Sequence, residues 1–269
     1  MGRLEASAKS IGRKILPKEV KRKYKKYRRD KIENSVIIFV MDSCRYDSFE
    51  QAYDSQFPAK KVRKAHSPSN WTIPSHESII RGFLPFGDFE NPIKVFEPKF
   101  GTPLPNQFDY SFGVTAIPYL SSSSFIENHF HRHFDDYYCE EELDSADRIL
   151  KRASRYLKRS DNFIGLVNFG ETHSPYKNHS ETELDELLDK VDNGKLTYDD
   201  LQDMQKESAE YLIEKIRDFL EEIPEGTLVI VTADHGELFG EKGGFGHNPH
   251  KRAVYHKALY EVPLIYWHN

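Results

Sequence analysis

The apolar positions of the chain gather in short runs that alternate with helical patterns. SVIIFVM (35–41) is a continuous, β-branched run of the kind that forms a strand buried on both faces. The runs at 112–117, 163–169 and 227–233 have the same character, and 262–267 is a fifth candidate. Helical periodicity occupies the segments between them, at 45–56, 75–81, 122–130, 142–159 and 197–222. This alternation predicts an α/β fold, a doubly wound and mostly parallel sheet with helices on both faces.

Composition narrows the class of protein. The chain has 269 residues, of which 38% are hydrophobic, enough for one large α/β domain or two small ones. Two cysteines, Cys44 and Cys139, exclude a disulfide scaffold, and their spacing fits no zinc ribbon. The sequence contains neither an apolar run of about 18 residues, as a transmembrane helix requires, nor the apolar core of a signal peptide. We therefore expect a cytoplasmic protein.

Charge divides the chain into a basic N-terminal arm, residues 1–31, and an acidic remainder, residues 32–269. The arm carries 13 Lys or Arg against three acidic residues, a net charge of +10, whereas the whole chain is −5. Three interpretations stay open for it: a solvated tail, a contact with an anionic membrane surface, or a contact with a nucleic-acid backbone. We favour peripheral attachment to the membrane and expect no specific nucleic-acid partner.

Side chains able to bind a metal follow three of the apolar runs. Asp42 follows the first run, Glu171 and His173 follow the run at 163–169, and Asp234 and His235 follow the run at 227–233. In open α/β sheets ligands bind beyond the carboxyl ends of the strands, so we expect these residues to lie near one another. Each has a simpler explanation too, since Asp42 could cap the next helix and His173 could be an ordinary loop histidine.

The run Asp234-His235-Gly236 is the more specific signal. Two adjacent ligands of different type before a glycine suit a metal held at a tight turn. His247 follows in GGFGHN, where glycines allow a loop to fold back over a site. Four other histidines do not follow an apolar run and are interpreted as surface residues: His131, His133, His250 and His256.

NWTIPSHESIIRG (70–82) places Thr72 at the start of a predicted helix. With Pro74 in the first turn, Thr72 has the position of an N-cap. The alternative is a nucleophile presented where free backbone N–H groups bind an anion.

Four segments in order resemble the alkaline phosphatase superfamily, its sulfatase-like branch in particular. SPSNWTIPSHESIIRGFLP resembles the nucleophile segment, and SVIIFVMDSCRYD resembles the opening strand with its first metal ligand. NFGETHSPY resembles the middle histidine loop, and DHGELFGEKGGFGHNPH followed by YEVPLIYW resembles the later metal motif. The resemblance covers roughly residues 35–267 and implies an alkaline-phosphatase-like fold.

The resemblance also implies roles for individual residues. One divalent cation (zinc, manganese or magnesium) would be held by Asp42, Thr72, Asp234 and His235. Thr72 would be the nucleophile as well. His173 and His247 match positions that bind a second metal ion or the substrate in the phosphoethanolamine-transferase and phosphodiesterase branches.

Departures from the sulfatase pattern shift the expected chemistry. Many sulfatases carry a second Asp where this chain has Ser43, and an arginine where it has His76. Their nucleophile is a formylglycine made from Cys or Ser, whereas this chain has Thr72, which argues against formylglycine chemistry. Arg81 replaces the usual Thr of a Thr-Gly pair, and Glu171 is the nearest substitute for a missing second-metal carboxylate.

We therefore expect a metal-dependent hydrolase or transferase that acts on phosphate monoesters or diesters through a metal-bound threonine. The alternatives are a sulfuric ester hydrolase without formylglycine, or a non-catalytic sulfatase-like protein that docks on an anionic surface.

Overall fold

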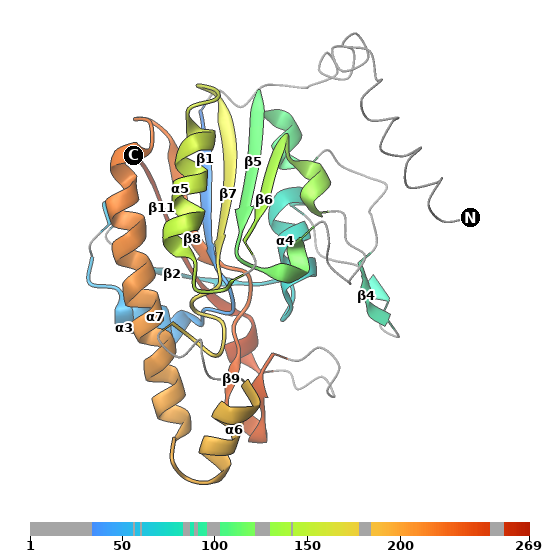
Figure 1. Ribbon diagram of the computed structural model, residues 1–269, viewed down its shortest axis with the longest axis vertical. Helices are drawn as coiled ribbons and strands as arrows, with labels where there is room; N and C mark the ends of the chain where they lie inside the picture. The colour runs from blue at the N-terminus through green and yellow to red at the C-terminus, as the bar shows by residue number, and fades with distance from the viewer. Residues whose placement is uncertain are drawn as a thin grey trace. The chain divides into compact units, whose positions relative to one another are not determined.

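Strand β1 (Val36–Met41) is the middle strand of a seven-stranded sheet, shown in Figure 1. The computed structural model describes residues 34–55, 57–59, 61–82, 87–88, 91–95, 103–121, 130–140, 142–177, 184–247 and 256–269. The basic arm with its expected membrane contact, the helix expected at 122–130 except for its last residue, and His250 lie outside these residues.

The sheet has the strand order β2-β11-β8-β1-β7-β5-β6. Strands β8, β1, β7, β5 and β6 run parallel, whereas β11 is antiparallel to both of its neighbours. The other strands of this sheet are β2 Arg63–His66, β5 Tyr110–Thr115, β6 Asp136–Cys139, β7 Phe163–Phe169, β8 Leu228–Ala233 and β11 Glu261–His268. Two small hairpins pair β3 Gly87–Asp88 with β4 Asn91–Val95, and β9 Leu238–Phe239 with β10 Phe245–Gly246.

Helices cover the sheet. The α-helices are α3 Tyr46–Ala52, α4 Thr72–Arg81, α5 Ala146–Leu157, α6 Leu184–Asp192 and α7 Tyr198–Phe219. The short 3₁₀ helices are η1 Leu104–Gln107, η2 Pro118–Leu120, η3 Phe130–His133, η4 Leu220–Glu222, η5 Glu241–Gly243 and η6 Lys257–Leu259. Helices α5 and α7 lie across the face turned toward the viewer in Figure 1.

The sheet separates two apolar layers. Ile37 and Phe39 of β1 belong to the core cluster that includes residues of α3, α5 and α7. Ile38 and Val40 are equally buried, and side chains alternate along a strand, so they face the other layer. Helix α4 lies in that second layer, because it contacts Asn168 of β7, whose neighbours in the strand face the first cluster.

The fold class predicted from the sequence is confirmed, with differences in detail. All five apolar runs are strands, but the fifth, β11, is antiparallel to the neighbouring β8. The strands β2 and β6 and the helix α6 were not predicted. β2 and β6 are edge strands whose side chains are half-buried or exposed, so they lack the apolar run that marks the central strands.

Candidate active site

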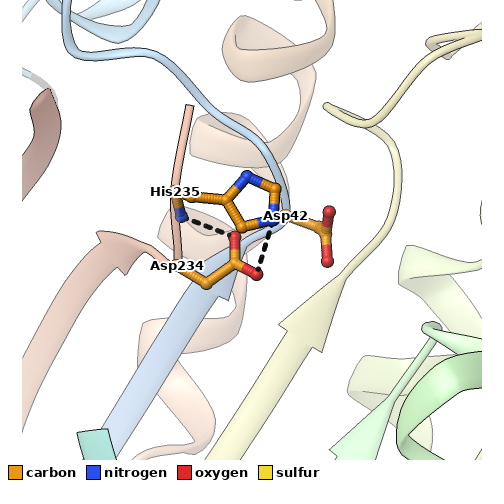
Figure 2. A group of neighbouring side chains, drawn as sticks. All are labelled: Asp42, Asp234 and His235. Carbon is orange, nitrogen blue, oxygen red and sulfur yellow. Dashed lines mark hydrogen bonds and ion pairs between the residues drawn. The ribbon is translucent and has the colours of Figure 1, made fainter. Parts of the chain in front are cut away.

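Three side chains meet at the carboxyl ends of two neighbouring strands. Asp42 directly follows β1, and Asp234 and His235 directly follow β8, its partner in the sheet. One ligand atom of each side chain lies within 4.8 Å of the others, and all three residues are at most 1% exposed. Figure 2 shows the carboxylates and the imidazole gathered above these strand ends. The parallel topology therefore joins segments that are far apart in the sequence.

Each of the two carboxylates has one oxygen to which no described residue donates a hydrogen bond. Asp42 Oδ1 accepts a hydrogen bond from Ser43 Oγ at 2.9 Å, and Asp234 Oδ1 accepts from the backbone N–H groups of Ser43 and His235. The Oδ2 atoms of both are buried and have no hydrogen-bond partner among the described residues. Burial, together with the charge of Asp42, raises the pKa of Asp234 well above its usual value. Two buried carboxylate oxygens lacking donors are the arrangement that a cation stabilises.

The orientation of His235 would suit a metal ligand. Its Nδ1–H donates to the carbonyl oxygen of Gly236 at 3.0 Å, so Nε2 carries the lone pair. Nε2 lies 3.4 Å from Asp234 Oδ2 and 3.3 Å from Thr72 Oγ1. Burial, and secondarily the proximity of His247, lowers the pKa of His235 well below its usual value, which keeps the imidazole neutral. The donor set of two carboxylates, one imidazole and one hydroxyl fits a divalent cation such as zinc or manganese.

Gly236 allows the turn that carries Asp234 and His235 to approach η6. A Cβ atom at this position would lie 2.0 Å from the carbonyl oxygen of Ala258, too close for any side chain. The glycine after Asp234-His235 is thus required by packing, in agreement with the tight turn that the sequence predicts.

Thr72 is the first residue of α4, and the prediction that it is the N-cap is wrong. Trp71 takes the cap position with an extended backbone (φ −148°, ψ 146°), and the helix has no side-chain cap. Thr72 Oγ1 is instead turned toward His235 Nε2, and the residue is 3% exposed. Its hydroxyl therefore faces the ligand cluster rather than the free N–H groups of its own helix.

Arg81 is held within a buried ion-pair group. Its Nε donates to Glu77 Oε2 at 2.7 Å, and its guanidinium lies 3.2 Å from His133 Nε2. The interpretation of His133 as a surface residue is wrong, because its side chain is only 10% exposed and pairs with Glu77. This group joins α4 to η3 and stabilises the helix that presents Thr72.

His173 and His247 lie beside the ligand cluster. The ring of His247 is 4.3 Å from that of His235 and 5.1 Å from that of His173, measured between centroids. His247 Nδ1 is 3.4 Å from Ser43 Oγ and 3.9 Å from Glu237 Oε2. The hairpin of β9 and β10, which leads directly to His247, thus folds back over the strand ends, as its glycines suggest.

Two buried glutamates lie near this histidine group: Glu171 caps a helix, whereas Glu237 faces His247. Glu171 Oε1 accepts hydrogen bonds from the backbone N–H groups of Ser145 and Ala146, so it caps α5. Burial raises its pKa to about 7. Glu237, which the sequence analysis missed, accepts from Tyr176 and Gln205 through Oε1 and directs Oε2 toward His247 Nδ1, 3.9 Å away. The Oε2 atoms of both glutamates have no hydrogen-bond partner among the described residues. The sequence could have indicated Glu237, because it directly follows Asp234-His235-Gly236 in the run DHGE.

A pocket of about 390 Å³ borders the histidine group. It is lined by Glu142, Leu143, Asp144, Gly170, Glu171, His173, Pro175, Tyr176 and Lys177. His173 belongs both to this wall and to the group around His247, so the pocket adjoins the ligand cluster on the side of the β7 loop.

Comparison with known proteins identifies relatives of this arrangement. Residues 96–269 match the family model described as Sulfatase. A stretch of 238 residues is 26% identical to the low-salt glycan biosynthesis sulfotransferase Agl7 of Haloferax volcanii, covering 86% of this chain and 54% of that protein. The chain therefore spans about half the length of this curated relative.

Solved structures share the fold at low sequence identity. The periplasmic domain of EptC from Escherichia coli, in complex with Zn, has a TM-score of 0.59 at 14% identity, over 87% of this chain and 72% of that one. The periplasmic domain of the phosphoethanolamine transferase EptC from Campylobacter jejuni has a TM-score of 0.57 at 14% sequence identity, over 88% of this chain and 79% of that one. The lipoteichoic acid synthase LtaP from Listeria monocytogenes has a TM-score of 0.57 at 11% sequence identity, over 87% of this chain and 65% of that one.

The expected cytoplasmic location is contradicted by these comparisons, because the similar structures from E. coli and C. jejuni are periplasmic domains. The sequence argument failed because a low cysteine count and the lack of a long apolar run are compatible with other compartments. Among the described residues, no helix is both long and apolar enough to cross a bilayer.

Proposed function

Because the chain belongs to the sulfatase family, within the alkaline phosphatase superfamily, we propose that it is a metal-dependent hydrolase or transferase acting on phosphate esters through Thr72. One observation carries the proposal: the Thr72 hydroxyl lies 3.3 Å from His235 Nε2, beside two buried carboxylates that each have one oxygen with no hydrogen bond from the described residues. A hydroxyl, an imidazole and two carboxylates at one strand edge are the donors that would hold a divalent cation. His173 and His247 would bind a second cation or the substrate.

The residues of this chain would divide the reaction between them. A divalent cation held by these donors would supply Lewis acidity, which lowers the pKa of the Thr72 hydroxyl and offsets charge on the transferred group. Thr72 Oγ would attack phosphorus, the ester P–O bond would break, and the departing alcohol would gain the proton that Thr72 loses. Water or an acceptor alcohol would then attack the phosphothreonine and release Thr72. His173 and His247 would orient the group that enters or leaves.

Sulfate is the second candidate for the transferred group. The named relative from Haloferax volcanii is a sulfotransferase, and the matching family model is described as Sulfatase. Phosphate remains the first choice, since threonine at the nucleophile position cannot give the formylglycine that sulfatases use.

The test compares three proteins in the presence of zinc or manganese. We expect Thr72→Ala to lower turnover of bis(p-nitrophenyl) phosphate by about three orders of magnitude or more, while Thr72→Ser keeps measurable activity. Thr72→Ser removes the buried methyl group, whereas Thr72→Ala removes both the methyl and the hydroxyl group, so both melting temperatures should fall, that of Thr72→Ala further. Near wild-type turnover by Thr72→Ala would end the proposal. Faster turnover of p-nitrophenyl sulfate than of both p-nitrophenyl phosphate and the diester would favour the second candidate.

A further inference from the structure

His76 lies one helical turn after Thr72 and is fully buried between the nucleophile segment and the sheet. Its Nδ1 is 2.8 Å from the carbonyl oxygen of Thr72, and its Nε2 is 2.6 Å from Asn168 Nδ2 on β7. Nδ1 also lies 3.6 Å from Asp234 Oδ2, the carboxylate oxygen without a hydrogen-bond partner in the described part of the chain. The imidazole thus lies between the first turn of its own helix α4, strand β7 and the turn after β8.

The hydrogen bonds fix where the proton of this imidazole lies. A carbonyl oxygen only accepts, so Nδ1 carries the hydrogen that faces Thr72. An amide nitrogen only donates, so Asn168 Nδ2 donates to a bare Nε2. His76 is therefore a neutral donor whose N–H is directed at the turn carrying Thr72, with Asp234 Oδ2 next to it.

Asn168 is the polar side chain within the apolar strand FIGLVNF and is fully buried. Burying an amide in a sheet interior is unfavourable unless it makes hydrogen bonds. Its bond to His76 is the contact that its nitrogen makes, and it selects the tautomer with hydrogen on Nδ1. The strand thereby supports the orientation of a side chain on α4.

We propose that His76 is a positioning residue: its Nδ1–H bonds the Thr72 carbonyl in the first turn of α4 and sets that turn beside the candidate ligand Asp234, whose Oδ2 lies 3.6 Å away, and Asn168 holds its tautomer. This inference rests on the proposed function of Thr72 and Asp234. The resembling sulfatase segment has an arginine at this position, which would add a positive charge beside the carboxylates. A neutral donor sets the geometry and leaves both carboxylate charges to the cation.

Two substitutions of His76 test the contributions of its two ring nitrogens separately. The amide nitrogen of Asn in His76→Asn falls near the position of Nδ1, whereas that of Gln in His76→Gln falls near Nε2. We expect His76→Asn to bind zinc within about threefold of wild type and His76→Gln to bind about 10- to 100-fold more weakly, in a calorimetric titration of the metal-free protein with zinc alone. Turnover of bis(p-nitrophenyl) phosphate at saturating zinc should fall in the same order, in kcat more than in KM.

Asn168→Leu provides the matched control and an independent test should His76→Gln fold poorly. In the wild-type background it should weaken zinc binding, because the tautomer is no longer held; in the His76→Asn background it should change zinc affinity by less than about twofold, since no Nε2 remains to contact. Equal zinc affinities of His76→Asn and His76→Gln, or an unchanged affinity in Asn168→Leu alone, would overturn the inference. An active Thr72→Ala protein together with weak zinc binding by His76→Gln would instead reject the nucleophile and leave the positioning role standing.

Discussion

Replacing Asp42 by asparagine should raise the stability of the metal-free protein and remove the stability gained from metal. The ligand atoms of Asp42 and Asp234 lie within 4.8 Å of each other in a fully buried site. At an effective dielectric constant of 20, two like charges at that separation repel by about 3 kcal/mol. Asparagine has nearly the same shape, keeps Oδ1 as the acceptor for Ser43, and replaces the unpartnered Oδ2 with a donor.

Protonation of Asp234 in the metal-free protein reduces the stability gain expected from Asp42→Asn. Burial and the charge of Asp42 raise the pKa of Asp234, so the folded protein without metal relieves part of the repulsion by keeping a proton there. A carboxyl whose pKa is raised by folding destabilises the protein as pH rises from the unfolded value, near 4, to the folded value. We therefore expect a gain of about 1–3 kcal/mol at pH 7 for Asp42→Asn in a chelator, and a shallower loss of stability with pH.

Metal should reverse the order of the two proteins. At a free concentration of 1,000 times Kd, a ligand that binds only the folded state stabilises it by about 4.1 kcal/mol, more than the variant's advantage without metal. Wild type should gain this amount with zinc, whereas Asp42→Asn, lacking one ligand charge, should gain little. Urea unfolding at pH 7 with EDTA and with zinc measures all four free energies. A variant less stable than wild type in EDTA, or an equal zinc gain in both, would refute the reasoning.

Two further changes test how the site is supported. Burial alone would raise the pKa of Glu77, but the hydrogen bonds and charges of His133 and Arg81 lower it overall, so its contribution is present at neutral pH and lost as pH falls below about 4. Glu77→Gln should therefore reduce the free energy of unfolding by about 3 kcal/mol at pH 7, and by clearly less at pH 3, in urea titrations; an equal loss at both pH values would contradict the ion-pair argument. Gly236→Ala should weaken zinc binding at least about tenfold, because the new Cβ must displace the turn that holds Asp234 and His235 from the carbonyl of Ala258. Gly194→Ala, where φ is positive but no atom lies within 4 Å, should leave zinc affinity unchanged, and a similar affinity in the two variants would show that the close approach is unimportant.

The parts of the fold that the sequence predicted share one physical property. The central strands are buried on both faces, so their sequences are continuous apolar runs, and the residues after them necessarily meet at one edge. From that property the sequence predicts that Asp42, Asp234 and His235 lie near one another, as they do. Strand order and direction depend on pairing between distant segments, and this is why the antiparallel direction of β11 was not foreseen.

The missed features are those decided by tertiary contacts. Thr72 follows the local pattern of an N-cap, yet the extended backbone of Trp71 takes that position and the hydroxyl turns to His235. His133 has no strand context in the sequence and is buried through its pairing with Glu77. The sequence could have indicated that Asn168 needs a hydrogen-bond partner, since it is a single amide within an apolar strand. It could not have identified that partner, because His76 lies 92 positions away.

The position of the candidate ligands at the carboxyl ends of β1 and β8 has a consequence for the order of folding. These strands are neighbours in the sheet, but Ser43, which follows Asp42, contacts Asp234 across a sequence separation of 191 residues. Closing so long a loop is entropically costly and slow, and neither strand alone brings both carboxylates together. A cation that binds this cluster can therefore bind tightly only after β8 has paired with β1. Metal uptake would then report that the centre of the sheet has been assembled, and it would stabilise the correctly paired sheet over partly folded chains.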